Sequence, residues 1–167
     1  MASIAVSVAD KHTIDGLLAS VVELFREDAG THDPTTDISW PVREGADYYA
    51  GLLDDPGCLL LVARSDVGTT VGHLVGKLRE PTTLQPVRFA VLESIRVAPE
   101  VRGSGVGSRL VDQFFGWARD RAAAVASVSA YANNTRAQRF YQRHGFAPQT
   151  LTLRSAVPIA ADRRLDH

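Results

Sequence analysis

The residues best suited to bind an anion form the stretch Arg102-Gly103-Ser104-Gly105-Val106-Gly107. This stretch lies between an apolar run that ends at Val97 and a second apolar run that begins near Val106. Glycine adopts backbone angles that are closed to other residues, and it lets the main chain approach a ligand closely. The N–H groups of such a loop, together with the free donors at the start of a helix, favour phosphate binding. The stretch therefore predicts a pyrophosphate site.

This glycine stretch differs from the two best-known phosphate loops. A dinucleotide-binding G-x-G-x-x-G that starts at Gly103 would need glycine at position 108, where Ser108 stands. The Walker-type sequence G-K-[ST] does not occur in the chain. The pattern that remains is R-x-x-G-x-G between a strand and a helix, so a nucleotide-phosphate binder is disfavoured.

Two further motifs flank the glycine stretch. The first is Leu92-Glu93-Ser94-Ile95-Arg96-Val97, and the second is Asn134-Thr135-Arg136-Ala137-Gln138-Arg139-Phe140-Tyr141. In this order the three motifs resemble the GCN5-related N-acetyltransferase (GNAT) superfamily. The resemblance implies an acetyl-CoA-dependent N-acetyltransferase that acetylates a primary amine of a small molecule by direct attack in a ternary complex. A protein or peptide amine acceptor and a non-catalytic acyl-CoA-binding module remain as alternatives.

The resemblance also implies which residues bind acetyl-CoA, the acyl donor. The main chain of Ile95 and Val97 would pair with the pantetheine arm, and a backbone N–H near Ile95 would polarise the thioester carbonyl. The pyrophosphate would lie on residues 102–107, with Ser108 as an extra donor. Asn134, a good N-cap by type, would contact the pantetheine arm or cap its helix. The full predicted set is Ile95, Arg96, Val97, Arg102, Gly103, Ser104, Gly105, Val106, Gly107, Ser108, Asn134 and Tyr141.

Glu93 is the candidate catalytic base. A lysine-like amine has a pKa of about 10.4 and arrives mostly protonated, so a nearby proton acceptor is useful. Apolar strand neighbours such as Val91 and Ile95 imply partial desolvation of the carboxylate, which would make it a better acceptor. By resemblance, some polyamine-type members use a glutamate at this place, directly or through water. A structural Glu93, paired with an arginine or with backbone donors, is the alternative.

Tyr141 is the candidate catalytic acid. It belongs to the pattern F-Y-x-x-x-G-F at residues 140–146, in which the superfamily often uses the tyrosine to protonate the departing thiolate of coenzyme A. A phenol with a pKa of about 10 can donate a proton as charge develops on sulfur. A core aromatic residue is the alternative. His73 and His144 lack a partner pattern for metal or triad chemistry, so both are interpreted as structural or exposed and no metal site is predicted.

The segment from residue 27 to residue 55 has a strong excess of acidic side chains, opposed only by Arg43. By resemblance this segment lines the acceptor side of the cleft, so the excess favours a cationic amine. A solvated acidic surface is the alternative. Trp40, Tyr48 and Tyr49 would supply either walls for the acceptor or core contacts. The acidic residues are Glu27, Asp28, Asp33, Asp37, Glu44, Asp47, Asp54 and Asp55.

The composition sets broad limits on the function. With 167 residues, 45% of them hydrophobic, and a net charge of −1, the chain fits one soluble domain and shows no basic surplus for nucleic acid. The single cysteine, Cys58, excludes an intramolecular disulfide, and its apolar surroundings predict a buried, inert thiol. The apolar runs fall short of the roughly 20 residues that span a bilayer, and the N-terminus does not resemble a signal peptide. We therefore expect a cytoplasmic protein without a membrane partner.

Hydrophobic periodicity predicts strands over residues 2–8, 58–64, 70–79, 89–98, 125–132 and 150–154. Helices are predicted over residues 14–25, 44–53, 106–119 and 135–143, and a loop over residues 29–41. Residues 65–68 and 81–86 are predicted turns. In the strand 89–98, alternation predicts one face with Phe89, Val91, Glu93, Ile95 and Val97, and a second face with Ala90, Leu92, Ser94, Arg96 and Ala98.

This order of elements predicts an α+β fold with helices on both faces of one mixed sheet. The resemblance adds a mostly antiparallel GNAT-like sheet of about six to seven strands, in which two parallel strands splay apart near Val97 and Tyr131 and admit the cofactor. We expect a single domain over residues 1–154 and a poorly ordered tail over residues 155–167. Dimers are common in families of this kind, so the resemblance leaves both a monomer and a homodimer open.

Overall fold

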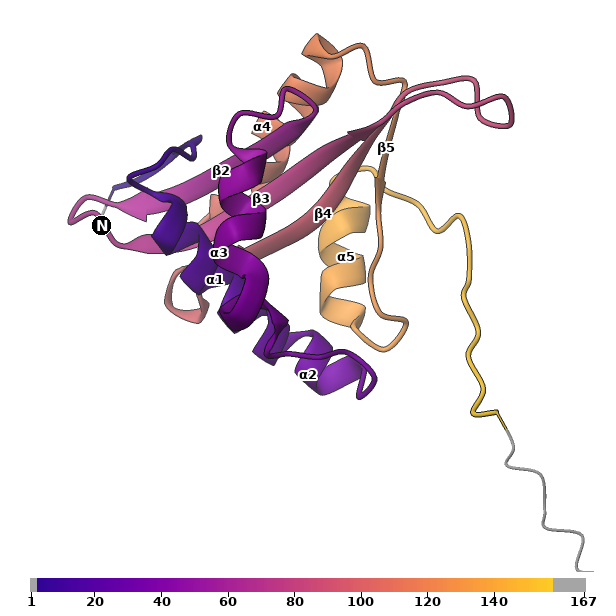
Figure 1. Ribbon diagram of the computed structural model, residues 1–167, viewed down its shortest axis with the longest axis horizontal. Coiled ribbons are helices and arrows are strands. Elements are labelled where there is room, and N and C mark those ends of the chain that lie inside the picture. The colour runs from indigo at the N-terminus through magenta and orange to yellow at the C-terminus, as the bar shows by residue number, and fades with distance from the viewer. Residues whose placement is uncertain (1–2, 158–167) are drawn as a thin grey trace, which may run out of the picture.

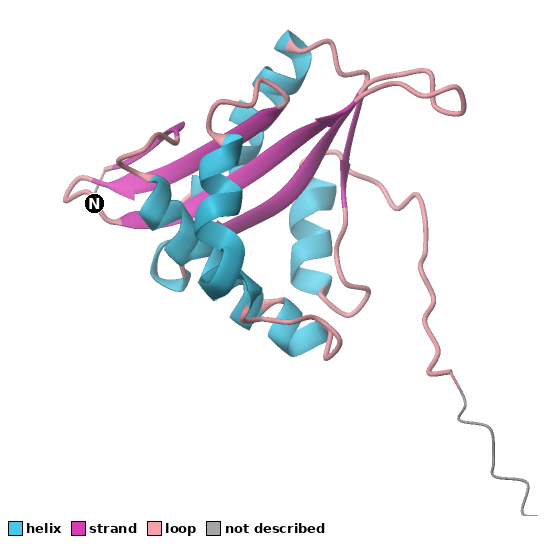
Figure 2. Cartoon of the chain, in the orientation of Figure 1, coloured by secondary structure: helices cyan, strands magenta, loops and turns pink. Residues whose placement is uncertain are grey.

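Five strands form one mixed sheet in a computed structural model that describes residues 3–157 (Figures 1 and 2). Their order across the sheet follows their order in the chain, with antiparallel pairs from β1 to β4 and a parallel pair between β4 and β5. This arrangement confirms the α+β class and the parallel pair. The strands are β1 (Ile4–Val8), β2 (Cys58–Ser65), β3 (Thr70–Arg79), β4 (Phe89–Val97) and β5 (Val125–Val128).

Helices cover both faces of the sheet. In Figure 1, α1 and α3 lie on the near face, and α4 lies on the far face. The amphipathic stripe of α4 explains its position, because Leu110, Phe114 and Ala118 return at four-residue spacing and are buried. The helices are α1 (Ile14–Glu27), α2 (Ala29–His32), α3 (Trp40–Leu52), α4 (Val106–Asp120) and α5 (Thr135–Arg143), and a 3₁₀ turn, η1, covers Pro99–Val101.

The sheet separates two apolar clusters. The cluster on the α4 side includes Leu61, Leu74, Leu92, Leu110 and Phe114, all at most 2% exposed. The cluster on the α1 and α3 side includes Leu17, Val21, Tyr49, Leu60 and Val62. Full burial of one such side chain contributes about 1.5–3 kcal/mol to the stability of the fold. The two clusters therefore hold the helices against both faces of the sheet.

Strand β4 contains a β-bulge at Glu93. Its register with β3 pairs Ser94 with Val75 and then Leu92 with Gly76, so Glu93 is the extra residue between two paired positions. An extra residue reverses the alternation of side chains between the two faces of a sheet. The predicted uniform alternation along residues 89–98 is therefore wrong.

The bulge determines which side chains share a face. Ala90 and Leu92 belong to the cluster on the α4 side, and Ile95 and Val97 pack against the same cluster although they have the opposite parity. After the bulge, Ser94 and Arg96 accordingly lie on the face covered by α1. Without the bulge, Ile95 and Val97 would point away from α4.

Three predicted elements differ from the structure. Strand β5 covers four residues rather than the predicted 125–132, and residues 150–154 contain no strand. The sheet thus has five described strands rather than six or seven. The predicted loop 29–41 contains α2 and the first residues of α3. Of the predicted tail, residues 158–167 lie outside the described residues.

Candidate active site

A hollow of about 760 Å³ lies where β4 and β5 diverge. The two strands pair only from Phe89 with Val125 to Leu92 with Val128. Beyond that point, residues 93–97 of β4 have no strand partner on the β5 side. The hollow is lined by every predicted cofactor-binding residue except Ser104, whose Oγ donates a hydrogen bond of 2.6 Å to the carbonyl of Val101.

The glycine loop owes its path to two left-handed residues. Gly103 has φ +81° and Gly105, the N-cap of α4, has φ +83°, a region that other residues enter at a cost. A Cβ at either position would meet no atom within 4 Å, so the backbone angle and not crowding requires glycine. At Gly107 a Cβ would lie 3.0 Å from the ring of Phe140, so this glycine lets α4 and α5 pack closely. Gly103, Gly105 and Gly107 thus line the hollow together with the start of α4, whereas the N–H of Ser104 donates to the carbonyl of Val101.

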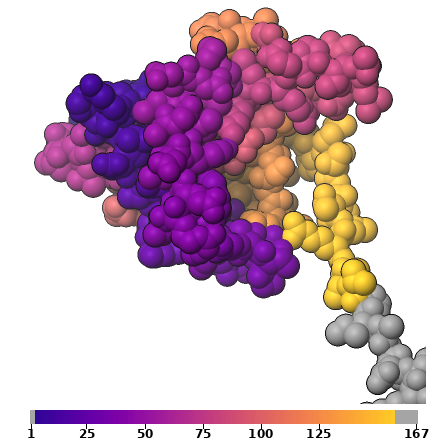
Figure 3. Space-filling view, viewed as in Figure 1, coloured from indigo at the N-terminus to yellow at the C-terminus, as the bar shows by residue number. Residues whose placement is uncertain are grey.

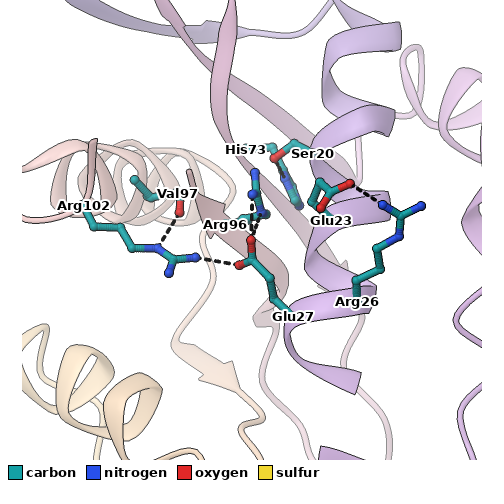
Figure 4. Close-up of polar contacts among 8 residues, drawn as sticks. All are labelled: Ser20, Glu23, Arg26, Glu27, His73, Arg96, Val97 and Arg102. Carbon is teal, nitrogen blue, oxygen red and sulfur yellow. Dashed lines mark hydrogen bonds and ion pairs between the residues drawn. The ribbon is translucent and has the colours of Figure 1, made fainter. Parts of the chain in front are cut away.

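Glu27 of α1 joins two arginines in the wall of the hollow (Figure 4). Its carboxylate accepts hydrogen bonds from Arg96 at 2.7 Å and from Arg102 at 2.6 Å, while Arg102 Nε donates to the carbonyl of Val97 at 2.8 Å. Burial alone would raise the pKa of Glu27, but the hydrogen bonds and charges of the two arginines hold it below its ordinary value. The network fixes Arg102 beside the glycine loop.

Several carboxylates of the acidic segment, residues 27–55, are hydrogen-bonded by residues that are distant in the sequence. Asp33 accepts a hydrogen bond of 2.8 Å from Arg154, and Asp28 accepts one of 2.9 Å from Asn134. Together with the contacts of Glu27, these bonds neutralise or occupy several carboxylates that looked unopposed along the sequence. For these residues the structure favours a role in packing rather than attraction of an acceptor.

Tyr141 is a half-buried and neutral phenol at the hollow. Burial and the charge of Asp28 raise its pKa to about 12. Its ring packs edge-on against Phe140 and Phe146, with centroids 5.5 and 5.9 Å away. Asn134 begins the same helix, and its side chain accepts a hydrogen bond of 3.0 Å from the N–H of Ala137, which confirms the predicted N-cap. Tyr141 can therefore donate a proton throughout the neutral pH range.

Glu93 has surroundings that differ from those predicted. The bulge leaves its side chain exposed, and it lies outside the hollow. The predicted desolvation by apolar neighbours is therefore absent. Burial is the largest cause that raises the pKa of Tyr49 to about 12, and the charge of Glu93 adds to it. The charge of Glu93 also favours the protonated form of Lys77. Lys77 in turn donates to the hydroxyl of Tyr48, so Glu93 lies near an aromatic and polar group under α3.

The remaining chemically versatile residues have structural partners. His73 is fully buried between Ser20 Oγ at 2.7 Å and Ser94 Oγ at 3.2 Å, and burial followed by the charge of Arg96 lowers its pKa to about 3. Cys58 is half-buried rather than buried as predicted, and burial, then a hydrogen bond to Asp55, raises the pKa of its thiol to about 11, as expected of an unreactive cysteine.

One predicted phosphate donor has a partner within the protein. Ser108 Oγ lies 3.1 Å from His144 Nε2, and the other ring nitrogen of His144 lies 2.9 Å from the carbonyl of Phe140. His144 therefore joins α4 to α5, as expected of a structural histidine. Within residues 3–157, His, Cys, Asp and Glu side chains do not form a group suited to a metal ion.

Several residues of the hollow were absent from the prediction. Arg136, Arg139 and Arg143 line it from α5, and the sequence offered a signal in their regular spacing on one helix. His32 of α2 also lines it, with its ring 5.5 Å from that of Tyr131. Its Nδ1 is buried and has no hydrogen-bond partner among residues 3–157, and no local sequence pattern indicated this placement.

Comparisons with known proteins agree with this geometry. The chain belongs to the acetyltransferase (GNAT) family, whose family model matches residues 18–146, and it is an N-acetyltransferase. An uncharacterized N-acetyltransferase of Archaeoglobus fulgidus is 28% identical over 133 residues, which cover 80% of this chain and 86% of that protein. In the described part of the chain, every helix is too short or too polar to traverse a lipid bilayer.

Solved structures share the fold at low sequence identity. The aminoglycoside 6'-N-acetyltransferase AAC(6')-Ih of Acinetobacter baumannii is similar with a TM-score of 0.71 and 21% identity, covering 94% of this chain and 99% of that one. The aminoglycoside N-acetyltransferase AAC(6')-Iy in complex with CoA gives a TM-score of 0.73 at 16% identity, covering 95% and 97%. A protein described as a transcriptional regulator of Bacillus halodurans gives 0.74 at 20% identity, covering 93% and 100%.

Proposed function

We propose that the protein transfers an acetyl group from acetyl-CoA to a primary amine of a small molecule by direct attack in a ternary complex. The observation that supports this most is one hollow that combines a left-handed glycine loop, a stretch of β4 that has separated from β5 and the half-buried phenol of Tyr141. The similarity to two aminoglycoside acetyltransferases agrees with a small amine.

Binding of the acyl donor would use the main chain more than side chains. The N–H groups of Gly103, Gly105 and Gly107 suit the pyrophosphate, and the three arginines of α5 supply positive charge for the other phosphate. The edge of β4 at Ile95 and Val97 that has separated from β5 suits the amide groups of the pantetheine arm, although the Val97 carbonyl already accepts a hydrogen bond from Arg102. A backbone N–H of this stretch would stabilise the oxyanion, an effect worth about 2.7–4 kcal/mol in enzymes where a donor was removed.

Proton transfer would involve the two candidate catalytic residues. Glu93 takes a proton from the ammonium group of the acceptor, directly or through a water molecule. The free amine nitrogen then attacks the thioester carbonyl carbon, and the carbon–sulfur bond breaks. Tyr141 donates its proton to the departing thiolate and regains one from the second proton that the nitrogen loses as the amide forms, while Glu93 releases the first proton to solvent.

The acceptor side is proposed to lie between Glu93 and α3. An exposed carboxylate near the aromatic rings of Tyr48 and Tyr49 attracts an ammonium group through charge and through the ring faces. A protein or peptide amine is the second acceptor class, since a ribosomal-protein-alanine N-acetyltransferase of Brucella melitensis shares the fold at 17% identity and a TM-score of 0.65.

The proposal is tested by thiol release from acetyl-CoA across a panel of diamines, polyamines, aminoglycosides and short peptides. We expect release to depend on a small amine and acetyl-CoA to bind more tightly than ATP in calorimetry. Release with peptides alone would move the acceptor to the second class. Binding of acetyl-CoA without release for any amine would indicate a non-catalytic module.

A further inference from the structure

Lys77 of β3 places a positive charge at the proposed acceptor side. Its neighbour Gly76 faces α4, because an added Cβ there would lie 2.9 Å from the ring of Phe114. Lys77 therefore points to the opposite face, where its ammonium donates to the hydroxyl of Tyr48 and lies 4.8 Å from the centroid of that ring. In Figure 3 the purple atoms of α3 border the pink atoms of β3 and β4 on the near side of the molecule. A cation thus lies among the aromatic side chains proposed to receive the acceptor.

Lys77 keeps its charge although it is half-buried. Burial by itself would lower the pKa of Lys77, but the hydrogen bond with Tyr48 and then the charge of Glu93 raise it above its ordinary value. An ammonium group has three N–H donors, and Tyr48 accepts a hydrogen bond from one of them. Among residues 3–157, no carboxylate forms an ion pair with Lys77. Its other donors can therefore bind an anionic group of a ligand.

Glu93 lies on the neighbouring strand at a distance that a small molecule can bridge. Lys77 pairs with Val91, and Glu93 follows Val91 by two positions in β4. With about 4.8 Å between strands and about 3.3 Å per residue, the Cα atoms of Lys77 and Glu93 lie roughly 8 Å apart. The charge of Glu93 acts on both Lys77 and Tyr49, so the three side chains lie close together. The acceptor side thus combines one acidic and one basic side chain that do not form an ion pair with each other.

A polycationic acceptor would need several carboxylates that are open to it. Asp37 and Glu44 both pair with Arg43, at 2.8 and 3.5 Å, and other carboxylates of the acidic segment are hydrogen-bonded by distant residues. The ring of Tyr48, which could attract a second ammonium group, already contacts Lys77. A second ammonium group would meet the repulsion of Lys77. These surroundings disfavour a polyamine and favour an acceptor with a negative charge of its own.

We propose that the acetyl acceptor is a small amino carboxylate, whose amine approaches Glu93 and whose carboxylate binds Lys77 and the hydroxyl of Tyr48. The Tyr48 oxygen accepts from Lys77 and keeps its own O–H for a carboxylate oxygen. The carboxylate thereby receives charge-assisted hydrogen bonds and offsets the charge of Lys77. This inference rests on the proposed function, because Glu93 is the base of that reaction. Lys77 determines specificity and takes no part in proton transfer.

Acceptor pairs that differ only in the carboxylate test this proposal. Thiol release from acetyl-CoA is measured with α-amino acids and linear ω-amino acids, each beside its own carboxamide and corrected for the fraction of free amine. We expect kcat/KM for at least one amino carboxylate to exceed that of its carboxamide by roughly 10–100-fold, the range typical of hydrogen bonds to charged groups. The difference should lie mainly in KM, because Lys77 acts on binding. Equal rates within every pair, or a preference for carboxamides or diamines, would overturn the proposal.

Substitutions at the two lysines of the chain assign the preference to one side chain. Lys77→Gln should abolish the preference for the carboxylate, while kcat/KM for the carboxamide stays within about twofold and shows that the variant is folded. Lys77→Arg keeps the charge and should retain most of the preference. Lys11→Gln, at an exposed lysine just before α1, is the matched control and should behave like the unmodified enzyme. An unchanged preference in Lys77→Gln would show that the carboxylate binds elsewhere.

Calorimetry on the enzyme saturated with CoA separates this inference from the proposed function. We expect an amino carboxylate to bind this complex, and the binding to be lost in Lys77→Gln. If that result is obtained but no amine releases thiol, the carboxylate site stands and the proposed function is wrong. If amines release thiol but no amino carboxylate binds in a manner that depends on Lys77, the proposed function stands and this inference is wrong.

Discussion

The two side chains proposed for proton transfer lie in opposite surroundings. Tyr141 is half-buried, and its raised pKa of about 12 keeps it protonated, as a proton donor requires. Glu93 is exposed at a bulge, where it can accept a proton from an incoming ammonium group. Bulges are frequent next to active sites, and here the bulged residue is Glu93, whose charge acts on Tyr49 of α3.

Substitution of Tyr141 by phenylalanine removes the proton donor while it preserves the packing of the ring. We expect Tyr141→Phe to lower kcat by about 100-fold, within the range typical of general acid catalysis. Acetyl-CoA affinity in calorimetry should remain within about twofold, because the hydroxyl acts on the leaving thiolate. Turnover equal to that of the unmodified enzyme would return Tyr141 to a purely packing role.

Glu93→Gln removes the proposed base without a large change in shape. We expect kcat/KM to fall by about 100-fold or more at neutral pH and to recover as the pH rises, because more of the acceptor amine is then already deprotonated. Cofactor affinity should persist. Glu80→Gln, at another exposed glutamate just after β3, is the matched control and should keep normal activity. Rate profiles that superimpose for the Glu93 variant and the unmodified enzyme would exclude Glu93 as the base.

Periodicity within single segments predicted most of the helices and strands, but it did not predict the bulge in β4. The stripe of α4 and the hairpin of β2 and β3 follow from periodicity within each segment, so they could be found from the sequence. The apolar alternation of the sequence continues on both sides of Glu93, so the sequence gives no sign of the extra residue. Its position depends on the pairing of Val75 with Ser94, a contact between different strands. Periodicity within β4 does not contain that information.

The glycine loop at the start of α4 provides a paired prediction. Gly105→Ala forces a left-handed alanine, so we expect a loss of about 1–2 kcal/mol in stability and weaker binding of acetyl-CoA. Gly116→Ala lies inside the same helix with nothing within 4 Å of the added Cβ, and it should stabilise by about 0.5–1 kcal/mol with normal binding. Urea unfolding and calorimetry measure both effects. Equal behaviour of the two variants would contradict the role assigned to the loop angle.

His73 connects β3 to α1 and β4, and it predicts an acid-sensitive sheet. The unfolded chain takes up a proton at this histidine near pH 6.5, whereas the folded protein does so only near pH 3. The stability that neutral His73 provides is therefore complete above about pH 6.5 and is lost as the pH falls toward 3, at about 1.4 kcal/mol per pH unit.

Urea unfolding between pH 7 and 4 measures this dependence. In His73→Gln the free energy of unfolding should change less steeply with pH, by the amount that corresponds to one proton taken up on unfolding. His12→Gln, at an exposed histidine, should keep the original slope. Identical slopes in all three proteins would show that His73 does not account for the acid sensitivity.

Across the whole molecule, the cleft joins segments that are far apart in the chain. The glycine loop and α5 were predicted because each is a continuous motif. The wall formed by α1 and α2 was not predicted. Its residue Glu27 contacts Arg96 and Arg102, which lie 69 and 75 positions further along the sequence. The same distance explains why the acidic segment looked unopposed in the sequence. Folding supplies arginines that pair with Glu27, so the net charge of −1 for the chain conceals a cleft in which arginines outnumber carboxylates.

Transfer to a small amine is the central claim, and amine-dependent release of coenzyme A from acetyl-CoA measures it most directly. The account predicts thiol release that saturates with at least one small primary amine, with an acetylated amine formed in equal amount. It also predicts that Tyr141→Phe binds acetyl-CoA normally but releases thiol slowly. If acetyl-CoA binds in the hollow, yet no small amine accelerates thiol release above the rate without acceptor, the claim is contradicted.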